Sequence, residues 1–180
     1  MANSEDDAPP DRRRFLKLAT GAIGGGVGLV LAAPVLRMCG APIGETTVSS
    51  PTEPIDVGGL DSFVVGGEPR RVEVIAPVVK DAWTASQQVV LGAAWVRRVA
   101  QDKIVAFSSV CPHLGCAVGW DASAKSYLCP CHDSRFAIEG PALSGPSKRG
   151  LDSLPVAVKD GRLQLVWKRF KNGGSTAEPA

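Results

Sequence analysis

Short runs that alternate between apolar and polar residues dominate the chain from Ile55 onward. Residues 71–74 read Arg-Val-Glu-Val, the period of a strand that buries only one face. Further short apolar runs lie at 89–91, 94–96 and 104–107, and Gly, Asp and Lys residues separate them. The pattern predicts an all-β domain built from short antiparallel strands.

The end of the chain carries the clearest turn signal. Residues 156–158 and 163–167 are strand-like and flank the dipeptide Asp160-Gly161. Asp-Gly between two such runs is typical of a tight β-hairpin, because both turn positions need a positive φ. Residues 171–180 show no apolar pattern, and we expect them to form a disordered tail.

An uncharged apolar stretch near the start has the length of a membrane span. It runs from Leu18 to Leu36, and at about 1.5 Å per residue it would cover roughly 28 Å, close to the thickness of a hydrocarbon core. Arg37 ends it, and no Ala-x-Ala cleavage site follows directly. We therefore predict an uncleaved single-pass anchor over residues 18–39, with a cleaved signal peptide as the alternative and Cys39 as an unpaired thiol near the outer interface.

The residues before the apolar stretch are basic. Residues 12–17 read Arg-Arg-Arg-Phe-Leu-Lys, which is similar to the twin-arginine export signal, although Asp11 stands where that signal usually has Ser or Thr. The alternative is an ordinary group of positive charges on the cytoplasmic side of a membrane helix. Both interpretations place residues 1–17 in the cytoplasm.

Residues 40–54 connect the apolar stretch to the strand-rich region without any hydrophobic period. Their Pro, Gly, Ser and Thr residues are typical of a linker, and we expect a flexible hinge here. The chain of 180 residues has a net charge of +2, so no large basic surface argues for binding to nucleic acid.

Four of the five cysteines and both histidines lie in two short segments, 111–116 and 129–132. One Cys and one His from each segment make a set that suits an iron–sulfur cluster in which two imidazoles replace two thiolates on one iron. A zinc site is the alternative, but zinc ribbons usually space their ligands Cys-x-x-Cys. Here Cys131 directly precedes His132, and adjacent side chains point apart, so the spacing favours the iron–sulfur cluster.

The pattern Cys-x-His-x-x-Cys followed by Cys-Pro-Cys-His resembles the Rieske iron–sulfur family, in particular the Rieske subunit of bacterial cytochrome bc-type complexes. The resemblance covers roughly residues 95–167. It implies an antiparallel Rieske-type β sandwich over residues 55–170, with an inserted cluster-binding subdomain at about 108–148. It also implies that Cys111 and Cys129 bind one iron of a 2Fe–2S cluster and that His113 and His132 bind the other.

The same resemblance assigns roles to residues around the cluster. Cys116 and Cys131 would form a disulfide between the two segments, and the Ser134 hydroxyl would donate to a bridging sulfide. Gly145-Pro146 would cover the cluster from a third side, and Leu114 would let the first segment lie close to a docking partner.

Phe136 occupies the position at which high-potential members have a tyrosine that donates to a ligand sulfur. Phenylalanine has no donor, so we expect a lower reduction potential, which suits menaquinol better than ubiquinol.

The function implied is that of the electron-transfer subunit of a quinol–cytochrome c reductase in the respiratory chain. A quinol would contact His132, or secondarily His113, in a site shared with cytochrome b, and the electron would pass to a c-type cytochrome. The protein would sit in the bacterial cytoplasmic membrane with its Rieske domain in the periplasm.

Three alternatives remain. One is the small subunit of an arsenite oxidase-type molybdoenzyme, against which Gly145-Pro146 counts. The second is a stand-alone Rieske carrier, which the anchor, the linker and the second cysteine pair disfavour. The third is a structural zinc module.

Overall fold

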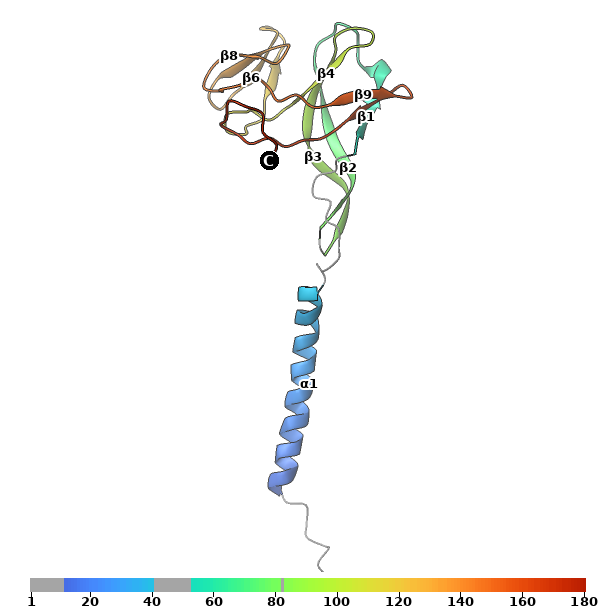
Figure 1. Cartoon of the computed structure of the whole chain (residues 1–180), viewed down its shortest axis with the longest axis vertical. Helices are drawn as coiled ribbons and strands as arrows, with labels where there is room; N and C mark the ends of the chain where they lie inside the picture. The colour runs from blue at the N-terminus through green and yellow to red at the C-terminus, as the bar shows by residue number, and fades with distance from the viewer. Residues whose placement is uncertain (1–11, 41–52, 82) are drawn as a thin grey trace, which may run out of the picture. The chain divides into compact units, whose positions relative to one another are not determined.

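The computed structural model describes residues 12–40, 53–81 and 83–180, which fall into two units divided between Thr46 and Thr47. The first unit contains one helix, α1 (Arg12–Gly40), drawn in blue in Figure 1. Within the described residues it is long and apolar enough to cross a membrane, and it buries no residue against protein. This is the segment for which the sequence predicts an anchor.

Helix α1 begins at Arg12, earlier than the apolar stretch that starts at Leu18. Arginine, leucine and lysine are good helix formers, so the helix continues through the basic segment. Cys39 lies exposed near its end as a free thiol. Most of the predicted hinge at 40–54, and the first residues of the predicted cytoplasmic segment, lie outside the described residues.

Among the described residues, the second unit contains three antiparallel sheets, as the alternating pattern predicts. The first has the order β1 (Ile55–Gly59), β10 (Arg162–Leu165), β9 (Val156–Lys159). The second has the order β2 (Arg70–Lys80), β3 (Ala85–Arg98), β4 (Ile104–Ser108). The third has the order β5 (Gly119–Asp121), β6 (Ser126–Cys129), β7 (Ser134–Ala137), β8 (Ala142–Ser144). A 3₁₀ turn, Leu60–Ser62, follows β1.

The predicted hairpin at Asp160-Gly161 joins β9 to β10, with Lys159 paired to Arg162. Both turn residues have positive φ, 51° and 71°, as a two-residue turn of this kind requires.

The runs at 89–91 and 94–96 were predicted as separate strands, but they belong to the single strand β3. Gly92 lies between them, and a Cβ atom there would come within 2.5 Å of the Trp167 ring. The glycine therefore makes room for a packed tryptophan and does not end the strand.

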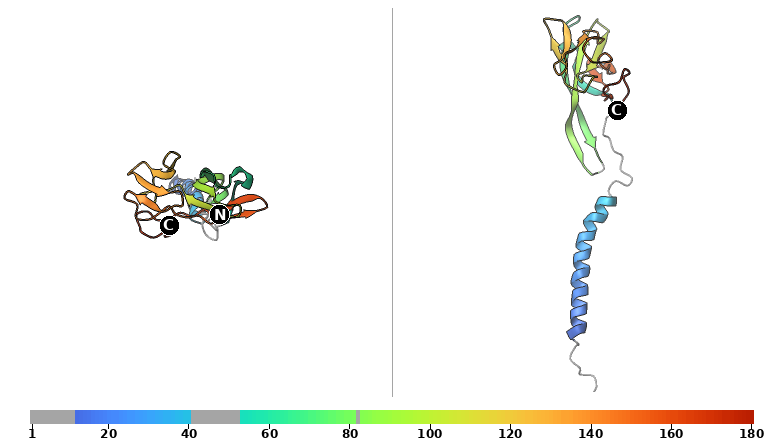
Figure 2. Two further views of the ribbon diagram at one scale, coloured as in Figure 1. Left: turned by 90° about the horizontal axis from the view of Figure 1, so that it is seen from above. Right: turned by 90° about the vertical axis from the view of Figure 1, so that its left-hand side faces the viewer.

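Strands β2 and β3 extend as a two-stranded ribbon, the long green hairpin in the right-hand view of Figure 2. Only the last part of β3, residues 94–98, pairs with β4.

Two hydrophobic cores hold the domain together. The first contains residues from the first two sheets, among them Val74, Val96 and Leu165, which are fully buried. The second lies around Tyr127 and Phe136, which face each other on β6 and β7 and have no exposed surface. The second core also contains two of the candidate ligand cysteines, so it supports the candidate metal centre directly.

The C-terminal residues differ from expectation. Residues 171–180 were predicted to be disordered, but they fold back on themselves: the Lys171 amide donates to the Glu178 carbonyl at 2.9 Å, and Phe170 forms an isolated bridge with Pro179. The amide of Ala180 donates to the carbonyl of Arg169 at 3.0 Å. Backbone hydrogen bonds rather than apolar burial give this segment its structure.

Candidate metal centre

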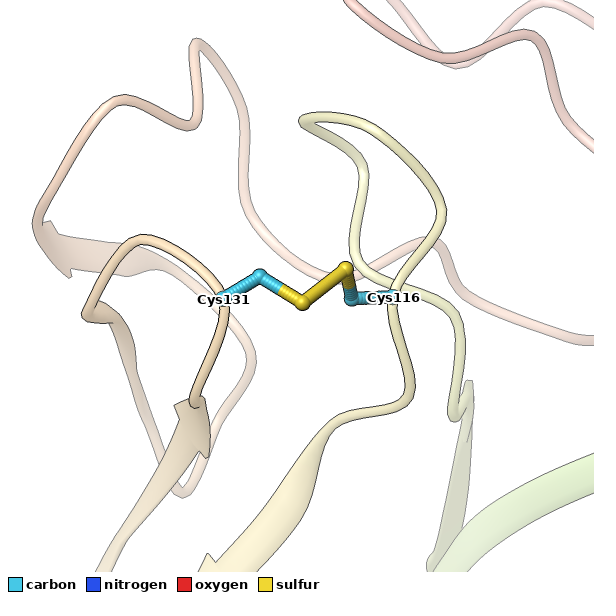
Figure 3. The surroundings of a disulfide bond; sticks show 2 residues. All are labelled: Cys116 and Cys131. Atoms are coloured by element: carbon cyan, nitrogen blue, oxygen red, sulfur yellow. A yellow bond between two sulfur atoms is a disulfide. The ribbon is translucent and has the colours of Figure 1, made fainter.

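Two loops carry the candidate ligands. The first leads from β4 to β5 and contains residues 111–116, and the second joins β6 to β7 and contains residues 130–133. A disulfide between Cys116 and Cys131 ties them together, as Figure 3 shows. The Cα atoms of the two cysteines are 6.6 Å apart. This is the pairing that the family resemblance implies.

Backbone hydrogen bonds also hold the first loop in its conformation. The Cys111 amide donates to the Cys116 carbonyl at 2.7 Å, and the Gly115 amide donates to the Cys111 carbonyl at 2.9 Å. Gly115 has a φ of 85°, which a residue with a side chain rarely adopts.

The two thiols that remain at the loops, Cys111 and Cys129, are buried, with exposed fractions of 1% and 2%. Burial raises the pKa of the Cys111 thiol, and the neighbouring Cys129 adds to the rise, whereas backbone N–H groups of His113 and Leu114 act in the opposite direction. Two buried thiols beside each other, with N–H groups directed at the sulfur, suit thiolates that are stabilised by a bound metal.

The two imidazoles lie beside each other on the outer side of the loops. The ring centroids of His113 and His132 are 4.9 Å apart and the rings are nearly perpendicular, at 85°. His113 is partly buried and His132 is exposed. The site is therefore asymmetric, with sulfur inside and nitrogen at the surface, as two differently ligated irons require.

Ser134, the first residue of β7, provides a test of whether a sulfur-containing cluster fits this site. Its side chain is fully buried, and its hydroxyl has no hydrogen-bond partner within the described residues. A buried hydroxyl without a partner costs free energy, so a partner is expected. A bridging sulfide is an acceptor that a 2Fe–2S cluster would supply, and the residues present fit that cofactor.

Gly145, in the segment predicted to cover the cluster, lies against the same serine. A Cβ atom on Gly145 would come within 2.5 Å of the Ser134 Cα and 2.9 Å of its Oγ, and the φ of Gly145 is 89°. Only glycine allows this approach. Leu114, the residue after His113, is exposed, and so is Pro146, the residue after Gly145.

A second group of sulfur atoms does not compete as a metal site. The Sγ atoms of Cys116, Cys129 and Cys131 lie within 4.8 Å of one another. Two of them are joined in the disulfide and are not available as thiolates. Their closeness shows instead how near the disulfide lies to a candidate ligand.

A buried ion pair that no sequence pattern predicts lies next to this site. Arg149 and Asp152 form two hydrogen bonds of 2.7 and 2.8 Å, and their side chains are only 7% and 5% exposed. The segment 170–180 also reaches the first loop, since the Gly173 amide donates to the Pro112 carbonyl at 2.8 Å. Neither contact could be predicted from the sequence, because charged residues and polar terminal segments usually lie exposed at the surface.

Comparisons with known proteins show the family to which the chain belongs. The Rieske [2Fe-2S] domain family matches residues 64–155. The menaquinol:cytochrome c reductase iron–sulfur subunit of Geobacillus thermodenitrificans is 33% identical, over 86% of this chain and 89% of its own length. That of Bacillus subtilis (strain 168) is 32% identical, over 91% and 95%.

A solved structure, the cyanobacterial plasma membrane Rieske protein from Synechocystis PCC 6803, is similar with a TM-score of 0.45 and 24% identity, over 62% of this chain and 97% of that one. The sequence matches cover both ligand loops. The chain belongs to the Rieske 2Fe–2S family and is a single-pass membrane electron carrier.

Proposed function

We propose that this chain is the Rieske subunit of a membrane quinol–cytochrome c reductase, with Cys111 and Cys129 binding the inner iron and His113 and His132 the outer one. The observation that carries the proposal is the asymmetry of the site. Its two thiols are buried, whereas its two imidazoles lie side by side and nearer the surface. The membrane helix and the names of the relatives, which are subunits of menaquinol:cytochrome c reductases, support it.

The 2Fe–2S cluster supplies one-electron transfer when it is bound. His132 is the exposed imidazole, so its Nε2 is the atom that a quinol hydroxyl reaches, and His113 is the second choice. An imidazole nitrogen that does not bind the iron can accept the proton that leaves the hydroxyl. Exposed Leu114, the residue after His113, would exclude water when a partner surface closes over the imidazoles. Cytochrome b would supply the rest of the quinol pocket, and a c-type cytochrome would receive the electron.

The placement in the membrane follows from the same proposal. Residues 12–17 act as a twin-arginine export signal that carries a folded domain with its cofactor across the bacterial cytoplasmic membrane. Residues 18–39 remain as the anchor, with the N-terminus in the cytoplasm and residues 55–170 in the periplasm. An oxidising compartment is where the disulfide between Cys116 and Cys131 would persist. Residues 40–54 serve as the hinge on which the domain moves between its partners.

Purification of the native protein in mild detergent tests this function. We expect b- and c-type haems to co-elute with the chain, and quinol to reduce the cluster in the complex. Co-elution with molybdenum would assign the chain instead to an arsenite oxidase-type enzyme, and elution without any partner would point to a stand-alone carrier.

Phe136 should keep the reduction potential low. It is fully buried in the same core as Cys129, and phenylalanine offers no hydrogen bond. Phe136→Tyr should raise the midpoint potential by about 40 mV, because a hydrogen bond worth roughly 1 kcal/mol that favours the reduced state corresponds to that shift for one electron. Phe136→Leu, which adds no donor, is the control. A redox titration that finds an unchanged or lower midpoint for the tyrosine variant contradicts this role.

A further inference from the structure

The segment Phe170–Ala180, here called the C-terminal strap, contacts the loop that carries His113. The Gly173 amide donates to the carbonyl of Pro112, the residue between two proposed ligands, at 2.8 Å. A Cβ atom on Gly115 would lie only 2.8 Å from the Asn172 side-chain nitrogen. The strap therefore packs against the first ligand loop at two points.

Arg149 fastens the strap to the body of the domain. Its Nη1 donates to the Gly174 carbonyl and its Nη2 donates to the Lys171 carbonyl, both at 2.8 Å. The same guanidinium makes the two hydrogen bonds to Asp152. Arginine has five donors in a planar fork, and lysine could not make all four contacts at once.

Asp152 is itself fixed beside the ligand loops. Its carbonyl accepts from the amide of Ser108, the last residue of β4, at 2.8 Å. The residue before it, Leu151, packs in the core that holds Cys111 and Cys129. A continuous series of contacts thus runs from β4 through Asp152, Arg149 and the strap to the Pro112 carbonyl.

We propose that Arg149 is a positioning residue of the metal centre, which acts through the C-terminal strap to fix the Pro112–His113 peptide and with it the imidazole of His113. The proposal rests on the ligand assignment given above. Groups that hold a metal ligand in place set its orientation and tune the metal, so the effect should be visible in the spectrum of the cluster.

Arg149 also supplies a charge. The pKa of its guanidinium is raised, first by the hydrogen bond to Asp152 and further by the charge of Asp152 and of Cys111. Removing the arginine would leave the Asp152 carboxylate buried and unpaired in this region. Loss of this positive charge disfavours the more negative, reduced state of the cluster.

Three variants, each made in the protein with its membrane helix and studied in detergent, separate the two effects. Arg149→Gln removes both strap contacts and charge, Arg149→Lys keeps the charge, and deletion of 171–180 leaves the Arg149–Asp152 pair intact. The matched control is Arg162→Gln, because Arg162 forms a similar two-point pair with Asp56 at the β1–β10 edge. The readouts are the midpoint potential, the histidine nitrogen couplings in the electron paramagnetic resonance of the reduced protein, and the rate at which visible absorbance is lost on warming.

We expect the deletion and both Arg149 variants to lose the cluster about tenfold faster than wild type, the effect of roughly 1.4 kcal/mol, and to show an altered nitrogen coupling. Only Arg149→Gln should also lower the midpoint potential, and Arg162→Gln should match wild type throughout. Wild-type couplings and loss rates in the deletion and in Arg149→Lys would overturn the proposal. A wild-type protein without nitrogen couplings would refute the ligand assignment, and with it the strap's role.

Discussion

Removing the disulfide by the double substitution Cys116→Ala/Cys131→Ala is expected to destabilise the cluster-bound domain by about 3 kcal/mol. The disulfide joins two residues with a sequence separation of 15. A cross-link of that length reduces the conformational entropy of the unfolded chain, which raises the free energy of unfolding by about 3 kcal/mol. It also holds together the two loops that carry the proposed ligands. Denaturation monitored through the visible absorbance of the cluster measures the change.

A single cysteine substitution should destabilise the cluster more than the double substitution does. If only Cys131 is replaced, the Cys116 thiol remains within 4.8 Å of the Cys129 sulfur. In air, dioxygen can accept two electrons as this thiol forms a disulfide with Cys129, which removes Cys129 from the cluster. Cys39→Ala is the control, because this exposed thiol lies on the helix of the other unit. Wild-type stability in the double variant would show that the loops do not depend on the disulfide.

Ser134→Ala is expected to lower the midpoint potential by about 60 mV. The Ser134 hydroxyl is buried without a partner within the described residues, and a hydrogen bond from it to a sulfide would favour the more negative, reduced state. About 1.4 kcal/mol of lost hydrogen-bond energy corresponds to that shift for one electron. Redox titration followed by electron paramagnetic resonance gives the value.

The matched control for this prediction is Ser126→Ala. Ser126 is also buried, at 4% exposure, but it lies at the end of β6 opposite Cys129. Its hydroxyl accepts a hydrogen bond from Arg135 at 3.4 Å. Its loss should leave the midpoint unchanged. A wild-type midpoint in Ser134→Ala, or an equal shift in both variants, would rule out a hydrogen bond from Ser134 to the cluster.

The elements that the sequence predicts correctly depend on local signals. Asp160-Gly161 determines its hairpin by itself, because the turn needs positive φ at both positions. The Cys-x-His-x-x-Cys and Cys-Pro-Cys-His segments identify the two loops by ligand type and spacing alone.

The elements that the sequence does not predict depend on contacts between distant residues. The polar segment 171–180 lacks any apolar pattern, yet hydrogen bonds from Arg149 and to Pro112 hold it in place. Gly92 suggests a break in β3, but the ring of Trp167, far along the chain, fills the space above it. Burial of the Arg149–Asp152 pair likewise depends on neighbours that no local pattern contains.

The nitrogen couplings of the reduced wild-type protein, measured after incorporation of ¹⁵N-labelled histidine, test the central claim most directly. The account predicts a 2Fe–2S signal coupled to two histidine nitrogens, with one coupling lost in His113→Ala and in His132→Ala if a signal persists. Purified protein that is colourless, releases no sulfide with acid and shows no histidine coupling would contradict it.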